Sequence, residues 1–142
     1  MTAKEKADQL HKKVKTFLLS CVGSDGYPLT KAVVPGKHRA SLSELYFCTN
    51  TSSNFVAAVS ENPKSSVYFY SRKLILWKGC YLKGDMEIVK DTHIKETFWD
   101  KKYAGAYEEG SFTDPDFCVL RFTPHSGRFY ANFTIADFEI LN

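Results

Sequence analysis

The stretch FCTNTSSNFVAAVSENPKSSVYFY, residues 47–70, holds two strand-like runs separated by a polar turn and a short helical pattern. Six polar residues, 49–54, follow the first apolar run. Apolar residues at helical spacing then predict a helix near 52–61. Pro63 ends this helix, because proline disfavours helix in the residue before it. The apolar run at 65–71 predicts the next strand, so strand, turn, helix and strand follow one another directly.

The polar turn allows two interpretations. The N-terminus of a helix presents unpaired N–H groups and a partial positive charge. The hydroxyls of Ser52 and Ser53 beside those groups would complete a phosphate site. Alternatively, one serine only caps the helix, and the residues by themselves favour this simpler interpretation.

Further strand-like runs lie on both sides of this stretch. They cover residues 16–22, 29–35 and 44–49 before the turn, and residues 74–89 and 117–133 after it. Gly79 and Gly84 fit a bulge or a barrel corner, and an interruption of the last strand at 124–127 is left open. Tight turns link most runs, so we expect a mainly β, antiparallel protein, and six such strands favour a small barrel.

Helical patterns lie at the start of the chain and after the fifth strand. Thr2 and Glu5 have the spacing of a capping box, and the apolar residues that follow predict a helix at about 3–14. Asp91 is a candidate N-cap for a helix at about 92–102. The glycine- and aromatic-containing segment 103–116 is loop-like.

The length of 142 residues fits one domain. We expect this domain to span 1–142, with an N-terminal helix within 1–15 and the barrel within 16–133. The tail, 134–142, carries no clear pattern.

The charge distribution gives weak evidence for nucleic-acid binding, because the net charge is only +3. Lysines gather near the start, at positions 4, 6, 12, 13 and 15. They alternate with Glu5 and Asp8, which is typical of a solvated helix face. No apolar run approaches the ~20 residues that span a bilayer, and the first residues lack an apolar signal region. We therefore expect a cytoplasmic protein.

The four cysteines, Cys21, Cys48, Cys80 and Cys118, lie in apolar, strand-like runs at wide and irregular spacings. No Cys-x-x-Cys pair is present, which argues against a zinc site. A buried thiol behaves as a small hydrophobe, and reduced thiols are the default in the cytosol. The four histidines are scattered without ligand spacing, so no metal site is predicted.

No hydrolytic, phosphate-loop or dinucleotide motif is present, and no catalytic residue can be named. Lys31 is unusual because it lies inside the apolar run LTKAVV. By alternation it shares a face with Val33; it either points to solvent or supplies a cation for the same phosphate. Five aromatic residues suit the core or an interface, but also a planar ring ligand: Trp77, Trp99, Tyr103, Tyr107 and Phe112.

Four segments together resemble one known family: DGYPLTKAVV (25–34), LYFCTNTSSNFVAAVSENPKSSVYF (45–69), WKGCYLKGDMEIVKD (77–91) and DPDFCVLRFTPHSGRFY (114–130). Their order is similar to that of the flavin-binding split barrels related to pyridoxamine 5′-phosphate oxidase, and within these to the general stress protein 26 group. The resemblance implies a six-stranded antiparallel split barrel that forms a homodimer. It also implies flavin mononucleotide (FMN) in two clefts at the subunit interface.

The resemblance also implies roles for individual residues. Lys31 falls near the flavin phosphate, and Ser53 matches the phosphate-binding serine. Thr49 falls where the turn contacts the flavin, with Ser52 and Asn54 beside it. The backbone of Ala32, Val33 and Val34 would line the flavin ring, while Trp77, Lys78 and Gly79 of the partner subunit would close the cleft.

Two departures from the family pattern matter for function. Asn54 and Phe55 stand where the family often has basic residues that neutralise the phosphate. Because a charge-assisted hydrogen bond is about twice as strong as a neutral one, FMN affinity is expected to be lowered, or another ligand is used. The ending GRFYANFTIADFEILN lacks the arginine- and tryptophan-containing motif of true pyridoxamine-phosphate oxidases, so oxidation of vitamin B6 phosphates is not expected.

Three functions follow. The first is an FMN-dependent oxidoreductase of unknown substrate, in which the flavin carries the electrons. The second is a non-enzymatic binding or storage protein for flavin or another planar cofactor, such as haem or a deazaflavin. The third is a cofactor-free dimeric barrel.

Overall fold

The structure, a computed structural model, describes residues 1–36, 38–39 and 41–141. Within these residues there are seven strands: β1 (Phe17–Val22), β2 (Pro28–Val33), β3 (Leu45–Asn50), β4 (Lys64–Lys73), β5 (Leu76–Val89), β6 (Phe117–Ala131) and β7 (Thr134–Glu139). The helices are α1 (Ala3–Lys13), α2 (Asn54–Glu61) and α3 (Thr92–Phe98), with a 3-10 helix η1 at Lys101–Ala106.

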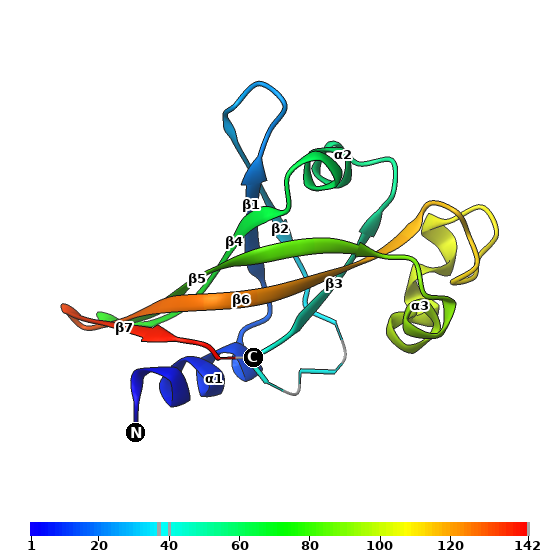
Figure 1. Cartoon of the computed structure of the whole chain (residues 1–142). Coiled ribbons are helices and arrows are strands. Elements are labelled where there is room, and N and C mark those ends of the chain that lie inside the picture. Colours follow the sequence, from blue (N-terminus) through cyan, green and yellow to red (C-terminus); the bar gives the residue numbers. More distant parts are fainter. Residues whose placement is uncertain (37, 40, 142) are drawn as a thin grey trace.

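The strands form one antiparallel sheet in the order β2-β1-β4-β5-β6-β3, with β7 beside β6 (Figure 1). The sheet curls so that its end strands approach each other but do not pair along their length. Among the described residues they meet in one isolated bridge, between Pro35 and Phe47. The fold is therefore a split barrel, and the prediction of a mainly antiparallel β protein is confirmed.

The end of the chain differs from the sequence-based expectation. All six expected strands are present, but the tail adds β7, which pairs with β6 from Ser126↔Glu139 to Ala131↔Thr134. Most side chains of β7 are exposed, so the tail lacks the alternation that would have revealed a strand. β6 is continuous through Pro124, which lies opposite Gly84 at a register shift; the ladder is irregular there and tolerates a proline.

The segment after β5 also differs. The predicted helix at 92–102 ends at Phe98, and η1 (Lys101–Ala106) covers the end of that range and the first residues of the stretch 103–116 that was expected to be loop. Asp91 caps α3, as predicted, by accepting hydrogen bonds from the His93 and Ile94 amides.

The core has two parts. Inside the barrel, Leu19, Val67 and Leu82 pair across neighbouring strands and are fully buried. A second cluster, around Phe98 and Phe117, also contains Tyr46 and four of the predicted aromatic candidates, all partly buried: Trp99, Tyr103, Tyr107 and Phe112. These four predicted aromatic candidates therefore pack in a core cluster.

The cysteines behave as the sequence predicts. Cys21, Cys80 and Cys118 are buried free thiols, and burial raises the pKa of Cys80 to about 12. Cys48 is half-buried, and its thiol donates to the carbonyl of Phe98. Among the described residues no cluster of potential ligands could hold a metal ion, and no helix within that part of the chain is long and apolar enough to cross a membrane.

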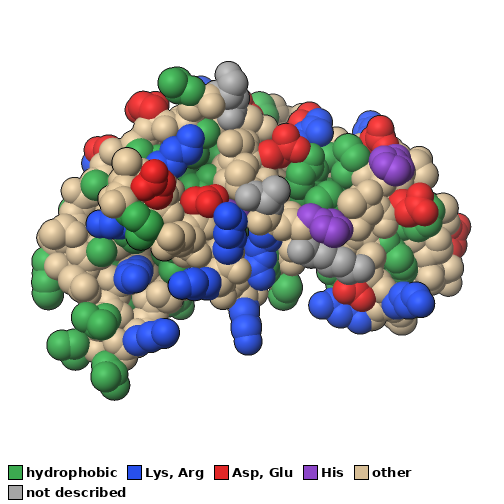
Figure 2. All heavy atoms as spheres, turned by 90° about the horizontal axis from the view of Figure 1, so that it is seen from below, with side chains coloured by type: hydrophobic (Ala, Val, Ile, Leu, Met, Phe, Trp, Pro, Cys, Tyr) green, Lys and Arg blue, Asp and Glu red, His purple; other side chains and the backbone are tan. Residues whose placement is uncertain are grey.

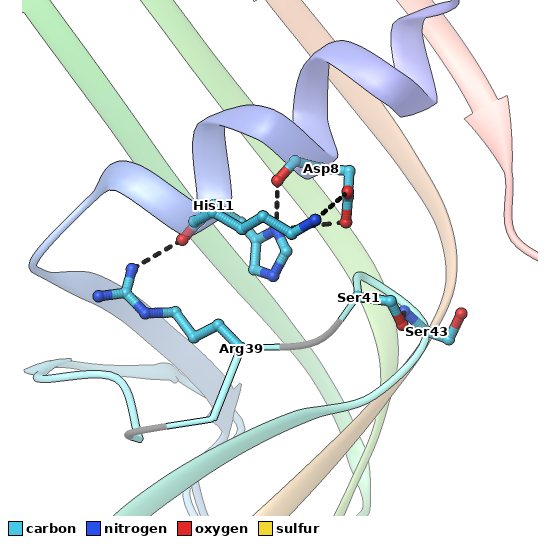
Figure 3. A network of polar contacts seen from close by, with 6 residues as sticks. Asp8, His11, Arg39, Ser41 and Ser43 are labelled. Carbon is cyan, nitrogen blue, oxygen red and sulfur yellow. Dashed lines mark hydrogen bonds and ion pairs between the residues drawn. The ribbon is translucent and has the colours of Figure 1, made fainter.

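Helix α1 packs below the sheet and is held at both ends. The predicted capping box is present between Thr2 and Glu5. At the other end, Arg39 Nη1 donates to the carbonyls of His11, at 2.8 Å, and Val14, at 2.5 Å. Figure 3 shows Arg39 reaching this end of α1 from the connection between β2 and β3. His11 is itself fully buried, and its Nδ1 lies 2.6 Å from the Asp8 carbonyl.

Candidate functional site

The polar turn leads directly into α2, and Ser53 is the N-cap of this helix. The Val56 amide donates to Ser53 Oγ at 3.2 Å. The first two helical amides, of Asn54 and Phe55, have no hydrogen-bond acceptor among the described residues. Such amides at a helix N-terminus carry partial positive charge. The turn is therefore a cap, as the residues alone favoured, and it also leaves two donors open.

The other side of the turn is acidic. The Ser52 amide donates to Asp116 Oδ1 at 2.8 Å, and the Thr51 amide donates to the Asp116 carbonyl, also at 2.8 Å. Together with Glu108, Glu109 and Asp114, these residues line a shallow depression of about 430 Å³. Carboxylates repel a phosphate, so an anion would bind on the side of Asn54 and Phe55 and not beside Ser52.

Lys31 reaches this same end of α2 from β2. Its ammonium donates to Thr49 Oγ1 at 2.6 Å and lies 5.6 Å from the centroid of the Phe55 ring. Among the described residues no carboxylate is within 4.0 Å of it. Burial lowers the pKa of Lys31, an effect that the nearby thiols of Cys118 and Cys21 oppose.

The alternation along β2 explains this position. Lys31 and Val33 turn toward the interior, whereas Ala32 and Val34 are exposed on the outside of the sheet. Because Leu19 is the pairing partner of Lys31 and is fully buried, the lysine extends along the inner face toward α2. The structure thus brings Lys31, Thr49 and the first turn of α2 together.

Phe55 is committed to the core and is only 2% exposed. Its side chain supports the ring contact with Lys31, and a basic residue at this position would lose that packing. Asn54 is exposed. The two positions that lack the expected cations therefore differ: Phe55 is buried in the core, whereas Asn54 is exposed on the surface.

The remaining predicted residues lie elsewhere in the chain. Trp77, Lys78 and Gly79 are on β5 where it forms a projecting hairpin with β4, and no contact joins them to Lys31 or the turn among the described residues. The Trp77 ring stacks on Tyr70, with centroids 4.9 Å apart and an interplanar angle of 7°. A Cβ at Gly79 would lie 2.5 Å from the Tyr68 hydroxyl oxygen, so a larger residue here would force the Tyr68 side chain to move.

Sequence reasoning named Tyr107 only as an aromatic candidate and did not name Asp116, and both contact the turn. Tyr107 donates its hydroxyl to Asn50 Oδ1 at 2.8 Å, and burial raises the pKa of Tyr107 to about 12. Asp116 accepts from the turn, as described above. The only signal for Asp116 is the acidic segment before β6, and nothing local places this segment beside a turn 64 residues earlier.

Comparison with protein families matches residues 3–131 to the family described as pyridoxamine 5′-phosphate oxidase. Among solved structures, one similar chain is a Clostridium acetobutylicum protein related to general stress protein 26 of Bacillus subtilis, of the pyridoxinephosphate oxidase family. It is 30% identical, with a TM-score of 0.82, over 99% of this chain and 97% of that chain.

Two more distant structures carry names that mention a ligand. A haem-binding protein from Mycobacterium smegmatis is 13% identical, with a TM-score of 0.78, over 98% of this chain and 58% of that chain. A pyridoxamine 5′-phosphate oxidase-related, FMN-binding protein from Nostoc punctiforme is 15% identical, with a TM-score of 0.66, over 94% of this chain and 92% of that chain. The comparison with curated proteins finds no match.

Proposed function

Because the chain belongs to the pyridoxamine 5′-phosphate oxidase family, we propose that it binds FMN and acts as an FMN-dependent oxidoreductase. The flavin phosphate lies between Lys31 and the first turn of α2. The FMN-binding relative from Nostoc punctiforme shares the fold, which supports this choice of cofactor. Oxidation of vitamin B6 phosphates is not part of the proposal, because the C-terminal segment lacks the motif expected for it.

One observation carries the proposal. Lys31 is half-buried, and its ammonium has no carboxylate within 4.0 Å among the described residues and lies 5.6 Å from the ring centroid of Phe55, a residue whose amide is open. A desolvated cation without a counter-ion is unfavourable, and a phosphate would supply the missing charge. The same phosphate would accept hydrogen bonds from the helix N-terminus.

We further propose that the protein is a homodimer with a flavin at the subunit interface. The outer face of the sheet carries a row of paired residues, Tyr70, Gly79, Tyr130 and Ile135, and Tyr70 and Ile135 are exposed in one chain. Val34 is also exposed. Aromatic side chains are enriched at interfaces, and a second copy on this face would bring its Trp77, Lys78 and Gly79 over Ala32 and Val34.

The flavin itself would carry the electrons, and the chain would bind and orient it. Lys31, Thr49 and the α2 amides would hold the phosphate, and the backbone of β2 would support the ring. With Asn54 and Phe55 in place of cations, the affinity is lower than at a site with two further positive charges. The buried free thiols support a reducing compartment such as the cytoplasm.

A second candidate function is binding of another planar cofactor, such as haem, without redox catalysis. The haem-binding relative with the same fold and the neutral Asn54 and Phe55 favour it. The visible spectrum separates the two cofactors, because flavin and haem absorb at different wavelengths. A protein that binds neither would be the cofactor-free barrel.

The test is the visible absorption spectrum of the purified protein before and after addition of FMN and desalting. We expect flavin near one equivalent per chain, and we expect Lys31→Met to weaken FMN binding by about tenfold or more, since a hydrogen bond to a charged group contributes about 1.5–3 kcal/mol. Lys90→Met, at an exposed lysine outside the site, should bind as the wild type does. Equal FMN affinity of the wild type and Lys31→Met would refute the phosphate site.

A further inference from the structure

A cavity of about 800 Å³ lies between α1 and the hairpin of β4 and β5. It opens where the sheet divides. The last pair between β1 and β4 is Leu18↔Tyr68, whereas β4 continues to Lys73 with only β5 as its partner. The cavity is therefore lined by the start of β1, the end of β4 and α1, which covers the opening between these strands, together with residues of β5 and β6.

The floor of the cavity is apolar. It is formed by Leu10 and Val14 from the end of α1, Leu76 from β5, and Phe129 and Ala131 from β6. The register places Phe129 opposite Cys80, and Ala131 opposite Lys78. The inner face of the barrel thus continues beyond the core along the hairpin and stays accessible under α1.

The rim of the cavity is basic. Five lysines line it: Lys6, Lys13, Lys15, Lys73 and Lys78. No aspartate or glutamate lines it, and among the described residues none of the five has a carboxylate within 4.0 Å.

The neighbouring Lys12 behaves differently. Its ammonium lies 2.9 Å from Asp8 Oδ2, on the side of α1 away from this cavity's lining. Figure 2 shows the molecule from the α1 side. Lys and Arg side chains form a band there, next to a group of hydrophobic side chains that projects at the lower left of the view. Of the five lysines near the start of the chain that the sequence assigned to a solvated helix face, three therefore line a cavity: Lys6, Lys13 and Lys15.

Five like charges line one cavity without a carboxylate among them, and like charges that share a site repel one another. An anion on the rim removes this repulsion, and the apolar floor gains by covering a hydrocarbon or ring. We propose that this cavity binds an anionic amphiphile, a molecule with a phosphate or carboxylate group on the lysine rim and an apolar part against Leu10, Val14 and Phe129. This site goes beyond the proposed flavin site, but its lining includes Lys78, which also belongs to the proposed flavin cleft, and Tyr70, which also belongs to the proposed dimer face.

The experiment is calorimetric titration of the full chain with dodecyl phosphate below its micelle concentration. Dodecyl maltoside, which has the same chain without the charge, and inorganic phosphate, which lacks the chain, are the comparison ligands. The variant is Lys6→Gln/Lys13→Gln/Lys73→Gln, which leaves Lys78 intact because Lys78 also belongs to the proposed flavin cleft. The control, Lys64→Gln/Lys90→Gln/Lys101→Gln, removes the same charge from exposed lysines elsewhere.

We expect one dodecyl phosphate per chain. Its affinity should fall about tenfold or more in the variant, because exposed charge contacts contribute about 0.2–1 kcal/mol each and three are removed. In the control its affinity should fall less than about twofold. FMN retention should be the same in all three proteins, so a failed flavin proposal leaves this result interpretable. Absence of binding, equal binding of dodecyl maltoside, or an unaffected variant would overturn the proposal. If a second copy of the chain fills the cavity, dodecyl phosphate should not bind.

Vesicles distinguish the source of the anion. Cosedimentation with phosphatidylglycerol vesicles, but not with phosphatidylcholine vesicles, that is lost in the variant would identify a lipid headgroup. Binding of dodecyl phosphate without cosedimentation would identify a free small molecule. Both results support the same chemistry at the lysine rim.

Discussion

Lys31 and Ser53 are the residues that decide the chemistry of the candidate site. The alternation of β2 directs Lys31 inward, and its ammonium donates a hydrogen bond to Thr49 Oγ1 on β3. Ser53 ends the turn and accepts from the Val56 amide. The open amides of Asn54 and Phe55 follow Ser53 directly in the chain. The site therefore combines one cation with two neutral donors, which suits a single phosphate better than a more highly charged ligand.

Two substitutions of Ser53 separate capping from anion binding. Ser53→Ala removes the cap and should lower the free energy of unfolding by about 1 kcal/mol. Ser53→Asp keeps a good cap but places a carboxylate beside the proposed phosphate, so stability should change little while FMN affinity falls. Urea denaturation and FMN titration measure the two effects. Unchanged FMN affinity in a folded Ser53→Asp protein would contradict the site assignment.

His11 gives the protein a predicted loss of stability in mild acid. Burial lowers its pKa, although the carbonyl and carboxylate of Asp8 act in the opposite direction, while Lys12 and Arg39 lower it further. His11 Nε2 is buried without a hydrogen-bond partner among the described residues. The unfolded chain takes up a proton at about pH 6.5, but the folded chain does so only at lower pH.

The stability that neutral His11 provides is therefore complete above about pH 6.5 and declines as the pH falls toward the lowered pKa. Thermal denaturation at several pH values should show this decline in the wild type, and His11→Gln should reduce it. His93→Gln, at an exposed histidine in α3, serves as the control and should retain the decline. A wild-type midpoint that does not change between pH 7.5 and 5 would refute the prediction.

At the scale of elements, the long strands β5 and β6 form the frame to which the other strands attach. β5 pairs with β4 and β6, and its register shifts between Lys83 and Gly84. This bulge, expected from the glycine in the sequence, allows Pro124 to lie inside β6. One glycine therefore permits two long strands to remain paired past a proline.

Gly84→Ala should be strongly destabilising. A Cβ at this position would lie 2.1 Å from the Thr123 carbonyl oxygen and 2.7 Å from Pro124 Cα, both of which are backbone atoms. Overpacking of this kind costs about 1–3 kcal/mol or more. Gly105→Ala is the matched control, because a Cβ there meets nothing within 4 Å. Urea denaturation should separate the two variants, and equal stability would show that the bulge shifts to accept a methyl group.

At the scale of the whole molecule, one chain leaves a large apolar surface on the outside of the sheet and at the hairpin ends. Ile135 is 60% exposed, and Tyr70 and Trp77 are exposed as a stacked pair. Leu74 and Phe133 have positive φ angles of 55° and 74° and are almost fully exposed. Such angles are unfavourable for bulky residues. Because Leu74 and Phe133 are also exposed apolar side chains at hairpin tips, they are further candidates for contact with a second copy.

Ile135→Glu should convert the proposed homodimer into a monomer, because a carboxylate would be buried against apolar side chains of the partner subunit. Sedimentation equilibrium should give about twice the chain mass of 16.1 kDa for the wild type and the single-chain mass for the variant. Ala57→Glu, on the exposed side of α2, should remain a dimer. A wild-type protein with the mass of one chain would refute the homodimer and the shared flavin cleft together.

The sequence alone determined the local structure of this protein. The capping box of Thr2 and Glu5, the Ser53 cap and the bulge at Gly84 all follow from residues close together in the chain, whereas the direction of Lys31 was left open by the sequence and is inward in the structure. Their periodicity, caps and breaks act over a few residues. A mainly antiparallel small barrel could be anticipated because tight turns join most of its strands, whereas the split barrel was implied by the family resemblance.

Tertiary structure alone decided which local features meet. The contact of Lys31 with Thr49 joins residues 18 positions apart, and that of Ser52 with Asp116 joins residues 64 positions apart. The pairing of β7 with β6 and the lysine-lined cavity under α1, which opens where β1 and β4 separate, likewise depend on the assembled sheet. Such contacts arise from the packing of the whole sheet, whose loops close at an entropic cost that grows only slowly with their length, and no short segment encodes them.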